Sequence, residues 1–170
     1  RHFLAIFSRD QLTADDLSNQ LARPVQFLGN PFMGPVLPPT ALLSNTQPRI
    51  GLLPGSRRPE LEANLQLLLR LSDQLPDNNG ISLELALVSS LDDTGLERCA
   101  NGVGWQLRDG LLQRQGSPAV RVRRGAFQTV LQQSELVIGM AGSAPEQAAG
   151  LTKPGLQISR QGPHVTASCA

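Results

Sequence analysis

The fold is decided by two segments, Ile50-Gly-Leu-Leu-Pro-Gly-Ser-Arg-Arg-Pro-Glu60 and Leu136-Val-Ile-Gly-Met-Ala-Gly-Ser-Ala-Pro-Glu-Gln147. In each, a short apolar run breaks at glycine and serine and is followed by residues that suit a helix. This is a strand–turn–helix pattern, which points backbone N–H groups and the positive end of a helix at an anion. Two such segments in one chain predict a ligand that carries phosphates, and we expect a nucleotide.

Short apolar runs recur along the rest of the second half of the chain. Between them the apolar residues take helical spacing, most regularly in the leucines that follow Pro59. Strands that alternate with helices favour an α/β fold, a Rossmann-like parallel sheet with helices on both faces. In such a sheet the loops at 52–58 and 139–146 should lie together at the carboxyl ends of their strands. The predicted strands cover residues 50–53, 81–88, 120–122, 136–138 and 156–158.

Individual residues mark where several elements begin or turn. Pro59 suits the first position of a helix, and Ser90, Asp92 and Asp93 suit the cap of a short helix that ends near residue 99. Another short helix is expected after Pro145. Asp109-Gly110 predicts a tight hairpin turn, and Trp105 beside it is expected to pack in the core.

The first 48 residues have a different character. Residues 2–7 and 25–28 predict two short strands, and Thr13 predicts the N-cap of a helix between them. The following stretch, residues 31–48, is rich in proline, which lacks an N–H donor, so we interpret it as a linker. We therefore expect residues 1–48 to be the end of one domain plus a linker, and residues 49–170 to be a nucleotide-binding domain.

The composition argues against several classes of protein. A net charge of +1 argues against a surface that binds nucleic acid through phosphates. The arginines at 57–58 and 121–124 are interpreted as solvated ends of elements. Cys99 and Cys169 provide neither a disulfide framework nor the spacing of metal ligands, which favours the cytoplasm and predicts no metal and no cofactor. No apolar stretch approaches transmembrane length.

The two opening segments resemble lipid-A-disaccharide synthase and its related proteins, which are two-domain glycosyltransferases of the GT-B type. The resemblance rests on Leu-Leu-Pro-Gly-Ser-Arg at 52–57 and Gly-Met-Ala-Gly-Ser-Ala-Pro-Glu-Gln at 139–147, with Gln-Gly-Pro at 161–163. Phe27-Leu-Gly-Asn-Pro31 is similar to the segment that joins the acceptor-binding domain to the donor-binding domain. The resemblance is closer to the related proteins than to the synthase. It implies that most of the N-terminal domain and the final helices lie outside this chain.

The resemblance also implies a site for a UDP-sugar donor. Gly142 and Ser143 would face the diphosphate, Glu146 would hold the ribose hydroxyls, and the 55–57 turn would line the opposite wall. The chemistry suits these roles, because glycine allows close approach, arginine donates two hydrogen bonds and a carboxylate accepts from a diol. The expected donor-binding residues are Gly55, Ser56, Arg57, Gly142, Ser143, Glu146, Gln147 and Gln161.

Simpler interpretations of these residues stay open. Pro54-Gly-Ser56 is also an ordinary turn after a strand. Glu146 also complements the positive end of a helix, and Arg57 also suits a solvated helix end. His164 and the pair at 92–93 are better explained as a surface histidine and as capping residues than as catalytic or metal-binding groups.

The expected activity is that of the donor half of an inverting, UDP-sugar-dependent glycosyltransferase with a lipid-linked acceptor. It needs no metal if helix N-termini and arginine stabilise the leaving diphosphate. The general base is expected from the missing domain, and the full protein is expected in the cytoplasm, peripheral to the inner membrane face. One alternative is a nucleotide-sugar 2-epimerase of the same architecture. Another is a degenerate, non-catalytic nucleotide-binding module, because Ser143, Pro145 and His164 depart from the family pattern.

Overall fold

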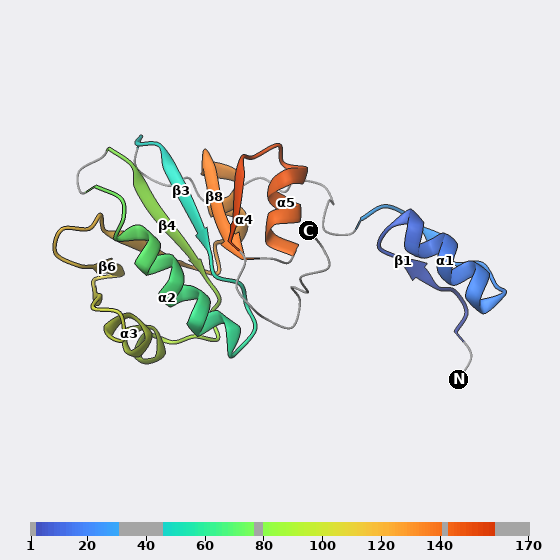
Figure 1. The fold of residues 1–170 in the computed structure, drawn as a ribbon, viewed down its shortest axis with the longest axis horizontal. Helices are drawn as coiled ribbons and strands as arrows, with labels where there is room; N and C mark the ends of the chain where they lie inside the picture. The colour runs from blue at the N-terminus through green and yellow to red at the C-terminus, as the bar shows by residue number, and fades with distance from the viewer. Residues whose placement is uncertain (1–2, 31–45, 77–79, 141–142, 159–170) are drawn as a thin grey trace. The chain divides into compact units, whose positions relative to one another are not determined.

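A computed structural model describes residues 3–30, 46–76, 80–140 and 143–158 (Figure 1). The chain divides into two compact units, residues 1–37 and 38–170. In the first, the parallel strands β1 (Phe7–Ser8) and β2 (Gln26–Phe27) are joined by helix α1 (Gln11–Leu21). The predicted linker falls largely in residues 31–45, which lie outside the described residues.

The helix in the first unit begins earlier than the sequence predicted. Its N-cap is Asp10 and not Thr13, because the Asp10 carboxylate accepts hydrogen bonds from the Thr13 backbone N–H at 2.8 Å and from the Thr13 hydroxyl at 2.9 Å. Both residue types cap helices well, and the two here bind each other. The predicted strand at 2–7 overlaps β1 only at Phe7, because residues 3–6 are not in a strand.

The second unit is a seven-stranded sheet with the strand order β5-β6-β7-β4-β3-β8-β9. All neighbouring strands are parallel except that β6 is antiparallel to both of its neighbours. This confirms the predicted α/β class with a Rossmann-like sheet. The strands are β3 (Arg49–Leu53), β4 (Ser82–Leu87), β5 (Gln106–Arg108), β6 (Leu111–Gln113), β7 (Val120–Arg124), β8 (Leu136–Met140) and β9 (Gly155–Ile158).

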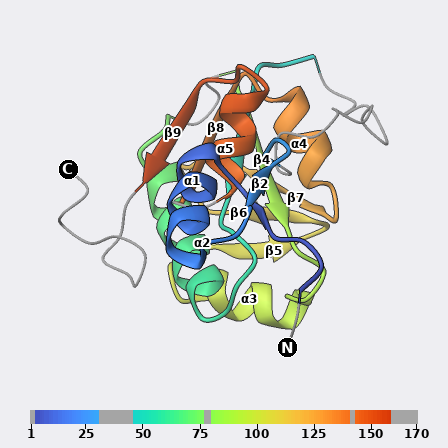
Figure 2. The same cartoon turned by 90° about the vertical axis from the view of Figure 1, so that its right-hand side faces the viewer.

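Helices cover both faces of this sheet, as Figures 1 and 2 show. One core contains side chains of α2 (Glu60–Ser72) and α3 (Asp93–Asn101). The other contains side chains of α4 (Phe127–Gln133) and α5 (Ser143–Gly150). Alternate residues of each central strand enter opposite cores; on β4, Leu85 packs towards α2 and Ala86 towards α4. This alternation follows from the pleat of a strand, and it makes the central strands apolar on both sides.

Close packing explains why β3 carries a glycine. A Cβ on Gly51 would lie 2.8 Å from the Ser134 hydroxyl and 3.1 Å from Val130 Cγ1, so a side chain there would meet the end of α4. Ser134 is itself fixed, since its hydroxyl donates to the Val130 carbonyl at 2.6 Å. Gly51 therefore sets how closely α4 approaches the centre of the sheet.

Several local predictions are confirmed within the second unit. Asp109 and Gly110 both have positive φ, 49° and 74°, as the predicted hairpin between β5 and β6 requires. Trp105 is completely buried. Asp92 caps α3, its carboxylate accepting from the Gly95 N–H at 2.8 Å. The helix expected after Pro145 exists, but the prediction of its start was wrong: α5 begins at Ser143, and Pro145 lies in its first turn, where proline removes no helical hydrogen bond.

Arg123 and Arg124 are not simply solvated, which corrects the sequence interpretation of the 121–124 arginines, whereas Arg121 is exposed. Arg123 Nε donates to the carboxylate of Glu84 at 2.7 Å, and the Glu84 side chain is completely buried. The other oxygen of Glu84 accepts from the Ser82 hydroxyl at 2.9 Å. Pairing of β4 with β7 brings these residues together, so the sheet itself creates the buried ion pair.

Candidate functional site at the carboxyl edge of the sheet

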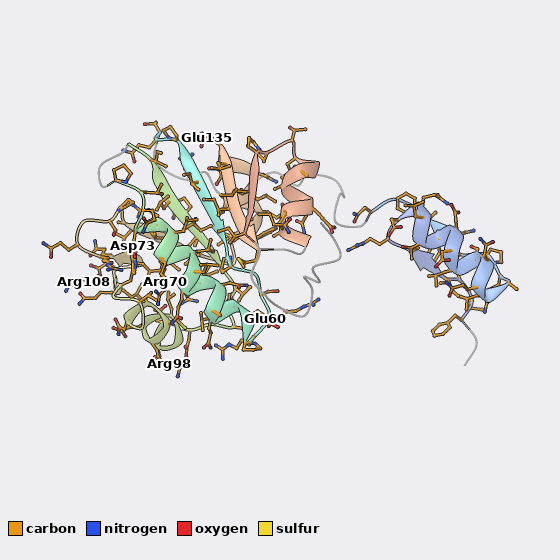
Figure 3. All side chains as sticks on the ribbon, in the orientation of Figure 1. Glu60, Arg70, Asp73, Arg98, Arg108 and Glu135 are labelled. Carbon is orange, nitrogen blue, oxygen red and sulfur yellow. The ribbon has the colours of Figure 1, made fainter. Side chains whose placement is uncertain are left out.

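The ends of β3 and β8 meet at one edge of the sheet. The strands pair in parallel with Leu53 opposite Gly139, so the loops that follow them begin side by side, as the sequence predicted. Figure 3 marks this carboxyl edge by Glu60 and the opposite edge by Glu135. The β3 connection enters α2 on one face, and the β8 connection enters α5 on the other. Open α/β sheets bind ligands where the connections of two adjacent strands diverge in this way.

The β3–α2 loop is anchored at both of its ends. Asn64 Nδ2 on α2 donates to the Pro54 carbonyl at 3.0 Å, where the chain leaves the buried strand. The Leu61 N–H donates to the Arg57 carbonyl at 2.8 Å, where the helix begins. The loop is therefore held in a defined position, although its middle is exposed.

The predicted site residues Gly55, Ser56 and Arg57 form this exposed middle. Gly55 has a φ of +90°, which L side chains rarely adopt, and a Cβ there would meet no atom within 4 Å. The requirement for glycine is thus set by the turn and not by a neighbouring side chain. Among the residues that the structure describes, none hydrogen-bonds or pairs with the Arg57 guanidinium. The turn presents a free cation at the carboxyl edge.

The positive end of α2 already has negative charges beside it. Glu60 and Glu62 occupy its first turn, and Pro59 before them makes no side-chain hydrogen bond to the helix. Glu62 also lies 3.7 Å from Arg58 in an exposed ion pair. These carboxylates complement the helix dipole and oppose a phosphate at the same position. An anion at this edge would therefore depend on Arg57 and on the neighbouring loop more than on the α2 dipole.

The β8–α5 connection contributes the remaining predicted residues. Ser143 is the first residue of α5, and Glu146 is half-buried in the first turn. Gln147 Oε1 accepts a hydrogen bond from Gln128 Nε2 at 3.1 Å, so its amide joins α5 to α4 in this structure. Gly142 and Gln161 lie outside the described residues.

A third loop lies at the same edge and was missed in the sequence. The β4–α3 loop, residues 88–92, follows the strand on the other side of β3. The Ser90 carbonyl accepts from Arg58 Nη2 at 3.3 Å, and the Leu91 carbonyl accepts from Arg124 Nη1. Both arginines belong to basic clusters of the sequence, but their partners are 31 to 33 residues away along the chain. No local pattern indicates such contacts.

The described part of the chain also bears on metal binding, on the state of the Cys99 thiol and on membrane crossing. Residues 3–30, 46–76, 80–140 and 143–158 hold no group of three metal-binding side chains. Burial raises the pKa of the Cys99 thiol, and the nearby Glu62 carboxylate adds to this effect, so the thiol stays protonated in the core. Within the same residues, no helix combines the length and the apolar character that crossing a membrane requires.

Comparison with protein-family models found no match for the chain, and comparison with curated proteins found no significant similarity. The family resemblance described above therefore stays a prediction. The structure shows how the strands and helices on either side of these loops are arranged.

Proposed function

We propose that residues 49–170 bind the nucleotide-sugar donor of an inverting, UDP-sugar-dependent glycosyltransferase related to lipid-A-disaccharide synthase. One observation carries the proposal: the two segments that resemble this family follow adjacent parallel strands and leave towards opposite faces of the sheet. Ligands in open α/β sheets bind at such a point. The paired residues Ile50 and Leu136 are 86 positions apart in the sequence, so the adjacency of the two segments is a consequence of the fold.

The proposed chemistry assigns a separate role to each loop. Arg57 donates charge-assisted hydrogen bonds to the diphosphate, and no residue in the described part of the chain competes for its guanidinium. Glu146 accepts hydrogen bonds from the ribose diol. Gly55, Gly142 and Ser143 let the diphosphate approach the backbone, and Gln147 and Gln161 complete the donor site. A guanidinium and backbone N–H groups stabilise the leaving UDP without a metal ion.

The family resemblance alone suggests the acceptor. We propose a lipid-linked sugar acceptor that is bound by a second domain, which also supplies the general base. The full protein would then act in the cytoplasm at the inner membrane face. The 170-residue chain would bind the donor without turnover.

The test is calorimetric titration of the 170-residue chain with UDP and, separately, with inorganic pyrophosphate. UDP should bind weakly, with a Kd of about 1 mM, equivalent to about 4 kcal/mol, because a second domain is proposed to complete the site. Arg57→Ala should weaken both ligands. Glu146→Ala should weaken UDP much more than pyrophosphate, since ribose is present only in UDP; a lost charge-assisted hydrogen bond costs roughly 1.5–3 kcal/mol.

Arg70→Ala serves as the matched control for Arg57→Ala. Arg70 is an exposed arginine in the last turn of α2, at the other end of the helix from Glu60 (Figure 3). Circular dichroism should confirm that all variants fold. Equal losses for UDP and pyrophosphate in Glu146→Ala would exclude the ribose role. A full-length protein that binds no nucleotide would favour the degenerate module, and interconversion of a UDP-sugar with its 2-epimer would favour the epimerase.

A further inference from the structure

The end of β7 and the β3–α2 loop both reach the β4–α3 loop. Arg124 is the last residue of β7 and lies opposite Leu87, the last residue of β4. Its Nη1 donates to the Leu91 carbonyl, and its Nη2 donates to the Asp93 carboxylate at 2.6 Å. The guanidinium thus joins the loop backbone to the first residue of α3.

The backbone anchors Arg124 in this position. The Gly125 N–H donates to the Leu87 carbonyl at 3.1 Å, so strand pairing continues one residue beyond β7. The Leu91 side chain is completely buried in the core, and this burial holds the Leu91 carbonyl in place. An arginine can make both contacts at once because its N–H groups form a rigid fork, whereas a lysine offers only one point of charge.

The adjacent carbonyl, that of Ser90, contacts the β3–α2 loop. Ser90 accepts from Arg58 Nη2 at 3.3 Å, and Arg58 is the neighbour of Arg57. The other contact of Arg58, with Glu62, is 3.7 Å long and half-exposed, and pairs of this kind contribute little. The position of the Arg57–Arg58 segment therefore depends on where the β4–α3 loop is held.

We propose that Arg124 is a positioning residue for the donor site. It holds the β4–α3 loop so that the Ser90 carbonyl can accept a hydrogen bond from Arg58. Arg58 then orients the β3–α2 loop, which presents Arg57 to the diphosphate. This inference rests on the proposed function, but it concerns a residue outside the segments that resemble the glycosyltransferase family.

The experiment is a double-mutant cycle on the 170-residue chain, with UDP affinity as the readout and thermal unfolding as a check on folding. Arg124→Gln should weaken UDP by roughly tenfold, a factor equivalent to about 1.4 kcal/mol. Arg124→Lys should retain part of the affinity through a single contact. In an Arg58→Gln background, Arg124→Gln should have almost no further effect, because the connection to the site is already lost.

Arg121→Gln is the matched control, since Arg121 is an exposed arginine on the same strand. It should leave UDP affinity unchanged. The positioning role is overturned if wild type binds UDP and Arg124→Gln binds it equally well, or if the full effect of Arg124→Gln persists in the Arg58→Gln background. If wild type itself binds no UDP, the proposed function fails, and the positioning role fails with it.

Discussion

Leu53 lies directly opposite Gly139 where β3 and β8 end, and a Cβ on Gly139 would lie 3.2 Å from Leu53 Cβ and 3.4 Å from the Leu53 carbonyl oxygen. The two residues therefore approach so closely because one of them has no side chain. The β3–α2 loop begins immediately after Leu53, and β8 ends one residue after Gly139. The spacing of the two strands at this point consequently sets the spacing of the loops.

Gly139→Ala should change both stability and ligand binding. The added methyl group must push the ends of β3 and β8 apart, and overpacking of this kind costs about 1 kcal/mol or more. UDP affinity should fall together with the melting temperature. Gly155→Ala on β9 is the control, because a Cβ there would lie 3.6 Å from Val137 Cγ2, an ordinary contact. Identical calorimetric results for the two variants would contradict this prediction.

Gly51→Ala should destabilise the sheet more strongly than Gly139→Ala, by roughly 1–3 kcal/mol, because its Cβ would lie 2.8 Å from the Ser134 hydroxyl. Chemical denaturation measures the loss. Ser134→Ala alone should cost about 1 kcal/mol through its hydrogen bond to Val130. Since removal of the hydroxyl relieves the clash, the double variant should be more stable than the sum of the single effects predicts. Strict additivity would argue against the clash.

Loss of one member of the buried ion pair should be the most costly change on the surface of the sheet that faces α4. Glu84→Ala leaves Arg123 without its carboxylate partner; because the Arg123 side chain is 28% exposed, the cost should stay below the roughly 3–5 kcal/mol of a fully buried pair. Denaturation in urea gives the value. Glu62→Ala, which removes an exposed pair with Arg58, should cost at most about 1 kcal/mol.

A paired replacement tests whether the charge itself causes this loss. Glu84→Met combined with Arg123→Met should recover much of the stability, because an apolar pair leaves no uncompensated buried charge. A double variant that is as unstable as Glu84→Ala would show that the shape of the side chains matters more than their charge.

The cap of α1 should respond to pH. The Thr13 backbone N–H, followed by the Thr13 hydroxyl, holds the pKa of Asp10 below its ordinary value of 3.8. Because the folded pKa is the lower one, the stabilising effect is complete above the ordinary value and is lost as the pH falls through the folded pKa. Carbon NMR of the Asp10 carboxyl should give a midpoint below 3.8, with amide exchange at Thr13 accelerating over the same range.

Asp10→Asn is the control for this titration. Asparagine caps helices about as well as aspartate but does not ionise. Protection of the Thr13 amide in this variant should not change over the acidic range in which Asp10 titrates. A midpoint at or above 3.8 for the wild-type carboxyl would contradict the structural explanation.

The elements predicted correctly are those whose signals are local. Asp109-Gly110 predicted the hairpin because a primed turn needs positive φ at two successive residues, and the structure has both. The start of α1 was predicted wrongly because Asp10 and Thr13 are both good caps and their sequence gives no means to choose. The ion pair of Arg123 with Glu84 could not be predicted, since it depends on the register of β4 against β7 across 39 residues.

The sequence by itself determined the class of the fold and the order of its elements. Apolar periodicity, proline and glycine act within a few residues, so they can be interpreted without any knowledge of distant contacts. Only the tertiary structure decided that Leu53 meets Gly139, that α2 and α5 lie on opposite faces, and that Arg58 and Arg124 reach the same loop. These contacts depend on strand order and register. They arise when the whole sheet buries its two apolar faces, and no single segment encodes that outcome.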